Sequence, residues 1–511
     1  MKKLIFLLGF FIISFIIALT ACEFHPHYVS KSKHSTISSH REYLALMKAR
    51  KNHTLTTDVL EEVVANFLDS PQDGRSVEPG EKTTIISVKK LSVIGEKHFA
   101  VPGSERSITS SSLENETVEL YAFITQKTGE DKPGYVLACN DLRIGNILGV
   151  VEEGSLDDHS ISWFTDAINE EIGYYIDEVI EEYNSITSEE VDQAVARNVF
   201  GDVVETYSGS EYHYQALGTA GLYHYSYPDK KYNVIYVAWE WNEGYYTLIP
   251  VTWGQSEPYN YVVNAHEHNG LNYLSGCGPV AVAQLMAYFK YPPLCTINDN
   301  FSSIGVNCHN YQYHWDKMTN SKTKNKISNE GAMDIAVLMY NVGHYRNILF
   351  EGWGVDKTDR SHGSVISSLI NMGYWSYDSF LDYNFSQIKG SIIYGSPVIV
   401  NGRTDPSICG APQGEGHYWI IDAVRNMIYY EKYINPETNI YTTYVNPGSE
   451  VGHIPLYSKW VHCNIGWDGT NNAWYMNEIF DFRNYNQSWA RSAVDENFYR
   501  YDLTILPYIN Y

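Results

Sequence analysis

A cysteine, Cys277, stands at the start of a segment that is predicted to be helical. Apolar residues recur along this segment with the three- and four-residue spacing that makes one buried stripe on a helix: Val282, Leu285, Met286 and Phe289. A thiol at a helix N-terminus feels the positive end of the helix dipole, which lowers its pKa and raises the thiolate fraction at neutral pH. The position therefore favours a nucleophile, although a lone cysteine is more commonly a buried structural residue.

Two downstream residues supply the partners that such a nucleophile needs. His417 begins a predicted strand over 416–422 at the exit of a glycine- and proline-rich loop, 140 residues after Cys277. Papain-like peptidases place their histidine roughly 130–150 residues after the cysteine. Asn464 follows in the motif His462-Cys-Asn-Ile-Gly-Trp467, where an amide can fix the orientation of an imidazole. Each residue also has a purely structural interpretation: His417 as a hydrogen-bonded histidine at a strand end, and Asn464 as a turn residue. The order cysteine, histidine, asparagine along the chain favours catalysis.

The chain resembles the streptopain family of papain-like cysteine peptidases, which are bacterial endopeptidases exported as zymogens. Four blocks carry the resemblance in the family's order: Trp253-Gly-Gln-Ser-Glu-Pro-Tyr-Asn260, Ser275-Gly-Cys-Gly-Pro-Val-Ala-Val-Ala-Gln-Leu-Met-Ala-Tyr-Phe-Lys-Tyr-Pro292, Gly416-His-Tyr-Trp-Ile-Ile-Asp422 and His462-Cys-Asn-Ile-Gly-Trp-Asp-Gly469. The resemblance implies an α+β papain-like domain, in which a helix bearing the nucleophile packs on an antiparallel sheet bearing the histidine, preceded by an α+β prodomain. It implies no metal and no other cofactor.

The resemblance also assigns roles to single residues. Cys277 would be the nucleophile, and His417 would take its proton and later protonate the leaving amine. Gln255 matches a glutamine whose side chain joins the Cys277 N–H in the oxyanion hole, where two donors stabilise the developing negative charge. Asn464 would be the amide that orients His417, and Trp467 would be the ring that shields it from water. Gly416 would contact the substrate, and Ser361 and Ser364 would belong to a loop that lines the substrate cleft.

The chain departs from the family pattern close to the expected site. Gly278-Pro279 follow the nucleophile where the family's type member has Val-Ala, and Ile465 stands where the closing motif has a tryptophan. The aromatic wall around His417 is therefore expected to be thinner. Neither change removes a group that the mechanism requires, so the predicted effect is on specificity.

The N-terminus has the features of an export signal. Lys2 and Lys3 precede an apolar run over 4–18, and Leu19-Thr-Ala-Cys22 resembles a bacterial lipobox. This pattern predicts a lipoprotein-type signal peptide over 1–22 and a lipid-bearing Cys22 that anchors an exported protein to a membrane of the bacterial cell envelope. Plain secretion with cleavage near the same place, or an uncleaved anchor, are the alternatives.

Four further segments are expected after the signal peptide. A flexible tether spans 23–55, and an inhibitory prodomain with amphipathic helices and strand-like runs spans 56–184. Its segment 134–154 resembles the streptopain-type prodomain, which packs against the catalytic cleft as an intramolecular inhibitor. A linker over 185–240 is expected to contain the maturation region, within 207–231, because proteases cut exposed, small and polar loops. The catalytic domain spans 241–511, and cleavage in the linker would release it from the lipid anchor.

Composition narrows the set of partners. The 511 residues carry a net charge of -24, which argues against nucleic acid or anionic lipid as a partner because phosphate recognition needs a basic surface. Aromatic residues make up 14% of the chain and favour β-rich structure. Of the seven cysteines, five remain once Cys22 and Cys277 are set aside, so at least one thiol is free; Cys295 and Cys308 are a possible pair.

Other functions fit the sequence less well than peptide hydrolysis. Transglutaminases and amidases also use cysteine and histidine, but the order of the motifs and the prodomain favour water as the acceptor. His266-Glu-His268 and Cys308-His309 lack the paired ligand spacing that is typical of zinc sites. A catalytically silent surface lipoprotein, an adhesin or inhibitor that keeps the papain-like shell, would be expected to lose Cys277, His417 or Gln255, and all three are present. We therefore predict a cysteine endopeptidase, made as a zymogen, that acts on proteins or peptides.

Overall fold

The computed structural model describes fourteen stretches of the chain. They are residues 40–49, 53–69, 82–94, 118–155, 162–195, 233–244, 247–267, 273–322, 324–344, 362–403, 416–435, 440–442, 456–480 and 503–511. The signal peptide with Cys22 and the expected maturation region lie outside these residues, so both stay predictions. No helix in the described stretches combines the length and the apolar character needed to cross a membrane.

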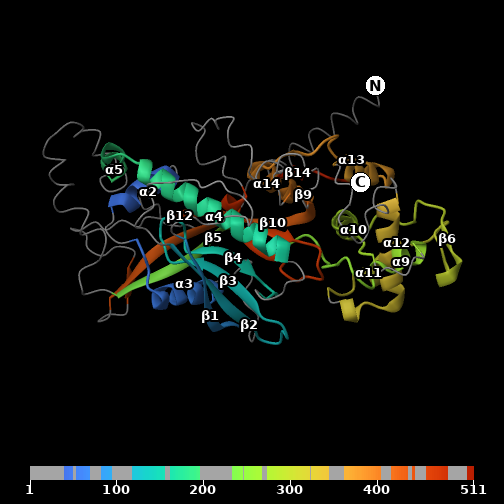
Figure 1. Ribbon diagram of the computed structural model, residues 1–511, viewed down its shortest axis with the longest axis horizontal. Helices are drawn as coiled ribbons and strands as arrows, with labels where there is room; N and C mark the ends of the chain where they lie inside the picture. Colours follow the sequence, from blue (N-terminus) through green and yellow to red (C-terminus); the bar gives the residue numbers. More distant parts are fainter. Residues whose placement is uncertain are drawn as a thin grey trace, which may run out of the picture.

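One antiparallel sheet runs through both halves of the chain (Figure 1). Its strands lie in the order β1-β2-β3-β4-β13-β12-β10-β9-β14-β8, and β5 and β11 pair with β10 beside this path. The strands are β1 (Thr83–Ile94), β2 (Val118–Lys127), β3 (Gly134–Cys139), β4 (Ile147–Val151), β5 (Asn233–Gly244), β8 (Leu381–Asp382), β9 (Val398–Arg403), β10 (Gly416–Asn435), β11 (Ile440–Thr442), β12 (Leu456–Asn464), β13 (Ala473–Met476) and β14 (Thr504–Leu506). A separate small hairpin is formed by β6 (Asn300–Phe301) and β7 (Val306–Asn307).

The described helices fall into three groups. Helices α9 (Tyr261–Glu267), α10 (Cys277–Phe289), α11 (Trp315–Met318) and α12 (Asn329–His344) lie together at one end of the molecule, on the right in Figure 1. Helices α13 (His362–Asn371) and α14 (Phe385–Ile393) lie near the chain's C-terminus. The N-terminal half contributes α2 (His40–Ala49), α3 (Thr57–Asp69), α4 (Ser162–Ser185) and α5 (Ser188–Val195). Three short 3-10 helices complete the described elements: η4 (Ser302–Ile304), η5 (Lys324–Lys326) and η6 (Asn477–Ile479).

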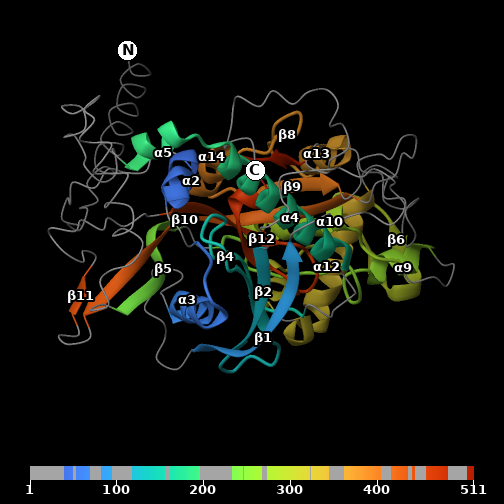
Figure 2. The same ribbon diagram turned by 60° about the vertical axis from the view of Figure 1, so that its left-hand side comes forward.

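The central strands are apolar on both faces because each face is covered by a different core. Along β10, Trp419 and Ile421 face the core that the N-terminal half shares, whereas Tyr418 and Ile420 face the core of α10 and α12. This alternation follows the two-residue period of a strand. In Figure 2, α10 and α12 lie on the right and α3 lies to their left, with the β1–β2 hairpin between α3 and α12 in this view. The predicted α+β class, with a helix that bears Cys277 packed on an antiparallel sheet that bears His417, is confirmed.

The N-terminal half begins earlier than the sequence suggests. Residues 40–49, expected within the flexible tether, form α2, because Tyr43, Leu44 and Met47 provide an apolar face that is buried beside α4 and α5. Lys48 Nζ donates to the carbonyls of Tyr183 and Ile186, at 3.0 and 2.8 Å, around the end of α4. A lysine suits that position because the end of a helix leaves carbonyls without intrahelical partners.

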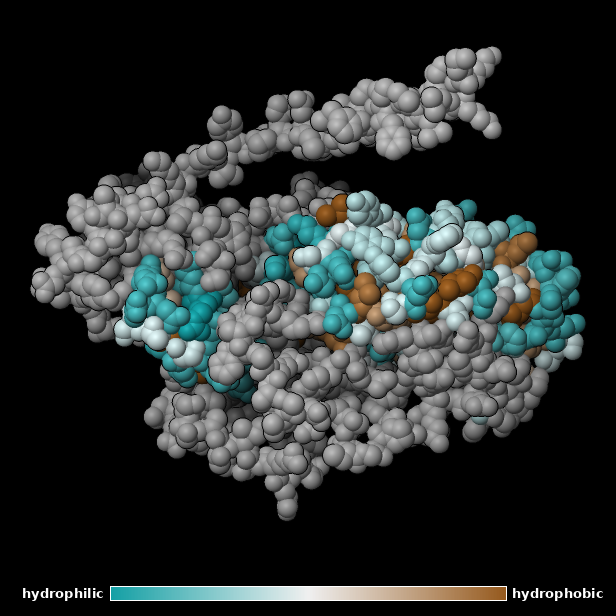
Figure 3. All heavy atoms as spheres, turned by 90° about the horizontal axis from the view of Figure 1, so that it is seen from above, coloured by the Kyte–Doolittle hydropathy of each residue, from teal (hydrophilic) through white to brown (hydrophobic). Residues whose placement is uncertain are grey.

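The expected linker over 185–240 is also partly structured. Helix α5 occupies 188–195, and β5 begins at Asn233 and pairs antiparallel with β10 over much of its length. Strand β5 therefore belongs to the sheet that carries His417. The two halves are joined a second time by β4 and β13, where Val150 lies opposite Trp474. The described surface in Figure 3 mixes hydrophilic residues with scattered small apolar patches, as expected when the large apolar faces are buried between the halves.

Candidate active site

Helix α10 places Cys277 at its first position, as the spacing of apolar residues predicts. Gly276 caps the helix with φ 88°, a left-handed conformation in which a Cβ is costly, so glycine suits this turn. Pro279 is tolerated in the first turn because N–H groups there have no intrahelical acceptor. Cys277 is partly exposed, whereas the other described cysteines, Cys139, Cys295, Cys308 and Cys463, are buried. Cys277 is therefore the accessible thiol in the described part of the chain.

His417 lies near the start of β10, opposite Gly402 of β9, and is 4% exposed. Its Nε2 is 2.9 Å from the carbonyl oxygen of Ile465. A carbonyl can only accept, so Nε2 carries the proton and Nδ1 is left as the acceptor of the neutral ring. Burial lowers the pKa of His417 to about 4, and the Ile465 carbonyl opposes this shift only in part. The imidazole is therefore neutral at physiological pH in this state of the protein.

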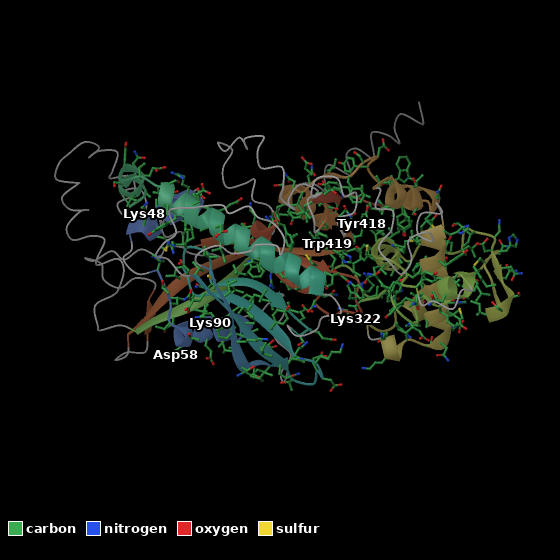
Figure 4. All side chains as sticks on the ribbon, in the orientation of Figure 1. Lys48, Asp58, Lys90, Lys322, Tyr418 and Trp419 are labelled. Atoms are coloured by element: carbon green, nitrogen blue, oxygen red, sulfur yellow. The ribbon has the colours of Figure 1, made fainter. Side chains whose placement is uncertain are left out.

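The first turn of α10 and His417 meet around the turn Asn464-Ile-Gly466. Ile465 holds the imidazole, and the next residue, Gly466, lies so close to Val280 in α10 that an added Cβ would be 2.9 Å from Val280 Cγ1. On the other side, a Cβ on Gly278 would be 3.7 Å from Cδ2 of Tyr418. Figure 4 shows Tyr418 and Trp419 where β10 meets α10. Packing thus brings the neighbours of Cys277 against the neighbours of His417.

Asn464 supports this turn through a complete set of hydrogen bonds. Its Nδ2 donates to the Val251 carbonyl at 3.0 Å and to Gln284 Oε1 at 3.1 Å. Its Oδ1 accepts from the Gly466 N–H and from Gln284 Nε2, each at 3.3 Å. An amide has two donor hydrogens and two acceptor lone pairs, and all four are used here. The bond from Asn464 to His417 that the family resemblance implies is therefore not formed, and the carbonyl of Ile465 takes its place.

Gln255 is buried and lies close to the start of α10. Its backbone carbonyl accepts from the N–H of Ser275 at 2.8 Å and from Ser275 Oγ at 3.1 Å, two residues before Cys277. The preceding Gly254 is in close contact with Asp468, since an added Cβ would be 2.8 Å from Asp468 Cγ. Asp468 also pairs with Lys324 at 2.9 Å. These contacts fix the backbone beside Cys277, and the oxyanion role of the Gln255 side chain stays a prediction.

The other predicted site residues are Trp467, Gly416, Ser364 and Ser361. Trp467 packs partly buried against the shared core, and its shielding role stays a prediction. Trp419 was not predicted as a site residue, yet its ring stacks on that of His417 with centroids 6.2 Å apart. The sequence contained one signal for this contact: Trp419 lies two residues after His417 in the predicted strand, so both side chains are on the same face of the sheet. Gly416 pairs with Arg403 at the start of β10. Ser364 lies in the first turn of α13 with its side chain undescribed, and Ser361 lies outside the described residues.

Burial sets the protonation of two of the other thiols. It raises the pKa of Cys139 and of Cys463 well above the usual range, so both stay protonated at neutral pH. Neither can compete with Cys277 as a thiolate. Within the described stretches, no group of three or more histidine, cysteine, aspartate or glutamate side chains is arranged to hold a metal ion.

Comparison with known families decides the class of this site. Residues 253–475 match the model of the Peptidase C10 family, from Trp253 beside Gln255 to Tyr475 in β13. Over these residues the chain is similar to that family. The resemblance to streptopain is thereby confirmed, and the C10 domain is a cysteine peptidase that contains Cys277, His417 and Asn464.

Two solved structures are similar to the chain with low scores. A prointerpain A fragment from Prevotella intermedia is 18% identical and has a TM-score of 0.38, covering 75% of this chain and 94% of its own. Active interpain A cysteine protease from Prevotella intermedia is 21% identical with a TM-score of 0.33, covering 52% of this chain and 95% of its own. These scores add no weight to the assignment of the C10 domain. No curated protein matches the chain.

Proposed function

We propose that the protein is an exported cysteine endopeptidase, made as a zymogen, that hydrolyses peptide bonds in proteins. The observation that carries this proposal is the state of His417. The ring donates through Nε2 to the Ile465 carbonyl and is neutral, so Nδ1 is free of a proton and is the nitrogen suited to act as a base. Cys277, the accessible described thiol, stands at the N-terminus of α10 beside the same turn.

The reaction follows from these groups. His417 Nδ1 takes the thiol proton of Cys277, and the thiolate attacks the carbonyl carbon of the scissile bond. The oxyanion that forms is stabilised by the Cys277 N–H and the side chain of Gln255. His417 returns its proton to the leaving amine as the C–N bond breaks, which leaves an acyl-enzyme on sulfur. Water, deprotonated by His417, then hydrolyses the thioester and restores the thiol.

The N-terminal half is proposed to act as the intramolecular inhibitor. At the end of β4, the N–H of Glu152 donates to the Asn472 carbonyl at 3.3 Å, and the Glu153 carbonyl accepts from the Asn471 N–H at 2.8 Å. Asn472 Oδ1 in turn accepts from the N–H of Ile465 at 3.0 Å, and the carbonyl of Ile465 holds His417. The N-terminal half thus lies two hydrogen bonds away from the residue that orients the catalytic histidine.

The charge state of His417 agrees with a latent enzyme. A thiolate–imidazolium pair needs a protonated ring, and a pKa of about 4 makes that ring costly to protonate at neutral pH. We infer that departure of the N-terminal half lets water reach the site, which raises the pKa of His417 and favours the ion pair. Latency would then depend on burial of His417 as well as on exclusion of substrate.

Anchoring and release are part of the same proposal. The sequence over 1–22 supports a lipid anchor on Cys22 at the bacterial cell envelope, with plain secretion as the alternative. A cut within the expected maturation region does not by itself separate the halves, because β4 stays paired with β13 and the shared core remains buried. Release of the C10 domain therefore needs dissociation or degradation of the N-terminal half after the cut.

The test compares residues 23–511 with the same protein carrying Cys277→Ala. Both are incubated, their masses are followed over time, and any new N-terminus is sequenced. Conversion of the parent alone to a fragment that contains the C10 domain, with casein hydrolysis, is the expected result. If neither converts, trypsin is added before the casein assay; a parent still inactive after trypsin would contradict the proposal and favour a silent surface protein.

A further inference from the structure

One buried amide in the nucleophile helix is not explained by the reaction. Gln284 lies seven residues after Cys277 in α10 and is 0% exposed, among neighbours that are apolar. Burying an amide without partners costs free energy, so such a side chain is retained only where hydrogen bonds satisfy it. Its partners therefore show what it contributes.

Gln284 binds two segments that are distant from α10 in the sequence. Its Oε1 accepts from the backbone N–H of Trp253 at 3.0 Å and from Asn464 Nδ2 at 3.1 Å. Its Nε2 donates to Asn464 Oδ1 at 3.3 Å, so the two amides face each other in a reciprocal pair. One side chain on the nucleophile helix thus contacts both of the other parts of the site.

Each contact lies next to a group that acts in the reaction. Trp253 is two residues before Gln255, the predicted oxyanion donor. Asn464 directly precedes Ile465, whose carbonyl orients His417, and Asn464 Oδ1 also accepts from the N–H of Gly466. The turn is thereby held on both sides of Ile465, and any shift of Asn464 moves the Ile465 carbonyl.

We propose that Gln284 is a positioning residue of the peptidase. It fixes the helix of Cys277, the segment of Gln255 and the turn that orients His417 relative to one another. The inference rests on the proposed peptidase activity and adds a residue that touches neither substrate nor the reacting atoms. Gln284 acts through Trp253 and Asn464.

The experiment uses three variants of the matured protein. Gln284→Met keeps much of the side-chain volume and removes all three hydrogen bonds. Gln284→Glu keeps the shape and the acceptor for the Trp253 N–H, and is the conservative variant. Val282→Ala is the matched control, because Val282 is buried in the same helix, has an apolar side chain that takes no part in this network, and its truncation weakens packing alone. The readouts are kcat and KM on a peptide substrate, and the pH dependence of Cys277 alkylation by iodoacetamide.

We expect Gln284→Met to lower kcat by about 100-fold with KM changed by less than about threefold, since small misplacement of catalytic groups has effects of this size. The alkylation profile should move toward that of an ordinary thiol, with a pKa of about 8.5, because His417 is no longer aligned with Cys277. Gln284→Glu should lie between Gln284→Met and the parent. Val282→Ala should keep the parental alkylation profile and lose activity only in proportion to any unfolded fraction.

Parental kcat and an unchanged alkylation profile in folded Gln284→Met would overturn the inference. If Gln284→Met does not fold, the same measurements on Gln284→Glu decide the question. Failure of the proposed function is distinguished by the parent. If the parent alkylates at Cys277 but hydrolyses no peptide, the function is wrong, and Gln284 is then judged by the alkylation profiles alone.

Discussion

The buried state of His417 predicts a specific loss of stability in acid. The pKa of the ring is lowered from 6.5 to about 4 in the folded protein, mainly because burial disfavours the imidazolium. Between these two values the unfolded chain binds a proton that the folded chain does not, so stability is lost as the pH falls through this window. Each pKa unit corresponds to about 1.4 kcal/mol.

The expected magnitude follows from these pKa values. Between about pH 8 and about pH 5, His417 should remove roughly 2 kcal/mol from the free energy of unfolding. His417→Gln removes the titrating group, whereas all other groups still titrate. The difference between parent and variant should therefore change by roughly 2 kcal/mol over this range, with the parent losing more in acid.

The assay is urea unfolding at both pH values. Each protein also carries Cys277→Ala, which prevents self-cleavage. If the two proteins lose the same free energy of unfolding between about pH 8 and about pH 5, then the pKa of His417 is not lowered by burial, and latency does not depend on its neutral state. A larger loss in the His417→Gln protein would contradict the sign of the shift.

Three further predictions follow from the site and its surroundings. Cys277→Ala should abolish peptide hydrolysis and leave the thermal midpoint within about 2 °C, because a partly exposed sulfur is removed; a residual rate above background would exclude Cys277 as the nucleophile. Gln255→Ala should lower kcat of the matured enzyme by roughly 100-fold or more with little change in KM. Gln255→Glu, which also lacks the amide donor and adds a negative charge, should lose at least as much, and parental kcat in either folded variant would exclude Gln255 as an oxyanion donor. Asp422→Asn should lower the free energy of unfolding by roughly 3 kcal/mol, because Asp422 Oδ1 lies 2.5 Å from Nδ1 of buried His462. The control is Asp316→Asn, which changes an exposed ion pair and should have no detectable effect on the free energy of unfolding.

The pair behind the last prediction also shows how burial and charge compete. Burial lowers the pKa of His462, but the carboxylate of Asp422 opposes this and the net pKa is raised. For His417, the hydrogen bond to the Ile465 carbonyl offsets burial only in part, so burial prevails and the pKa is lowered. Two buried histidines of the same domain are thus shifted in opposite directions by their different partners.

The local features of the site were predictable from the sequence. The helix that begins at Cys277 follows from the spacing of its apolar residues, and the strand at His417 follows from the apolar run behind it. Both signals are periodicities of consecutive residues, so they need no knowledge of the rest of the chain. The tether was misjudged because the polar composition of 23–55 hides the short apolar face of α2.

The orientation of His417 could not be predicted because it depends on a backbone carbonyl. Every residue has such a carbonyl, so no residue type marks the one at Ile465. Asn464 was the expected orienter, and only the structure shows that its four hydrogen-bonding positions are taken by other partners. The role of Gln284 could not be predicted either, because in the sequence it is one polar residue of a helix and its hydrogen-bond partners come from distant segments.

The sequence by itself determines the residue types and the order of Cys277, His417 and the C10 motifs. These were enough to predict a cysteine peptidase. Tertiary packing alone decides which atoms meet: the Ile465 carbonyl and His417, Gln284 and Asn464, and β4 and β13. The physical reason is that helix and strand periodicities act over a few residues, whereas burial and hydrogen bonding between segments up to several hundred residues apart depend on how the whole chain packs.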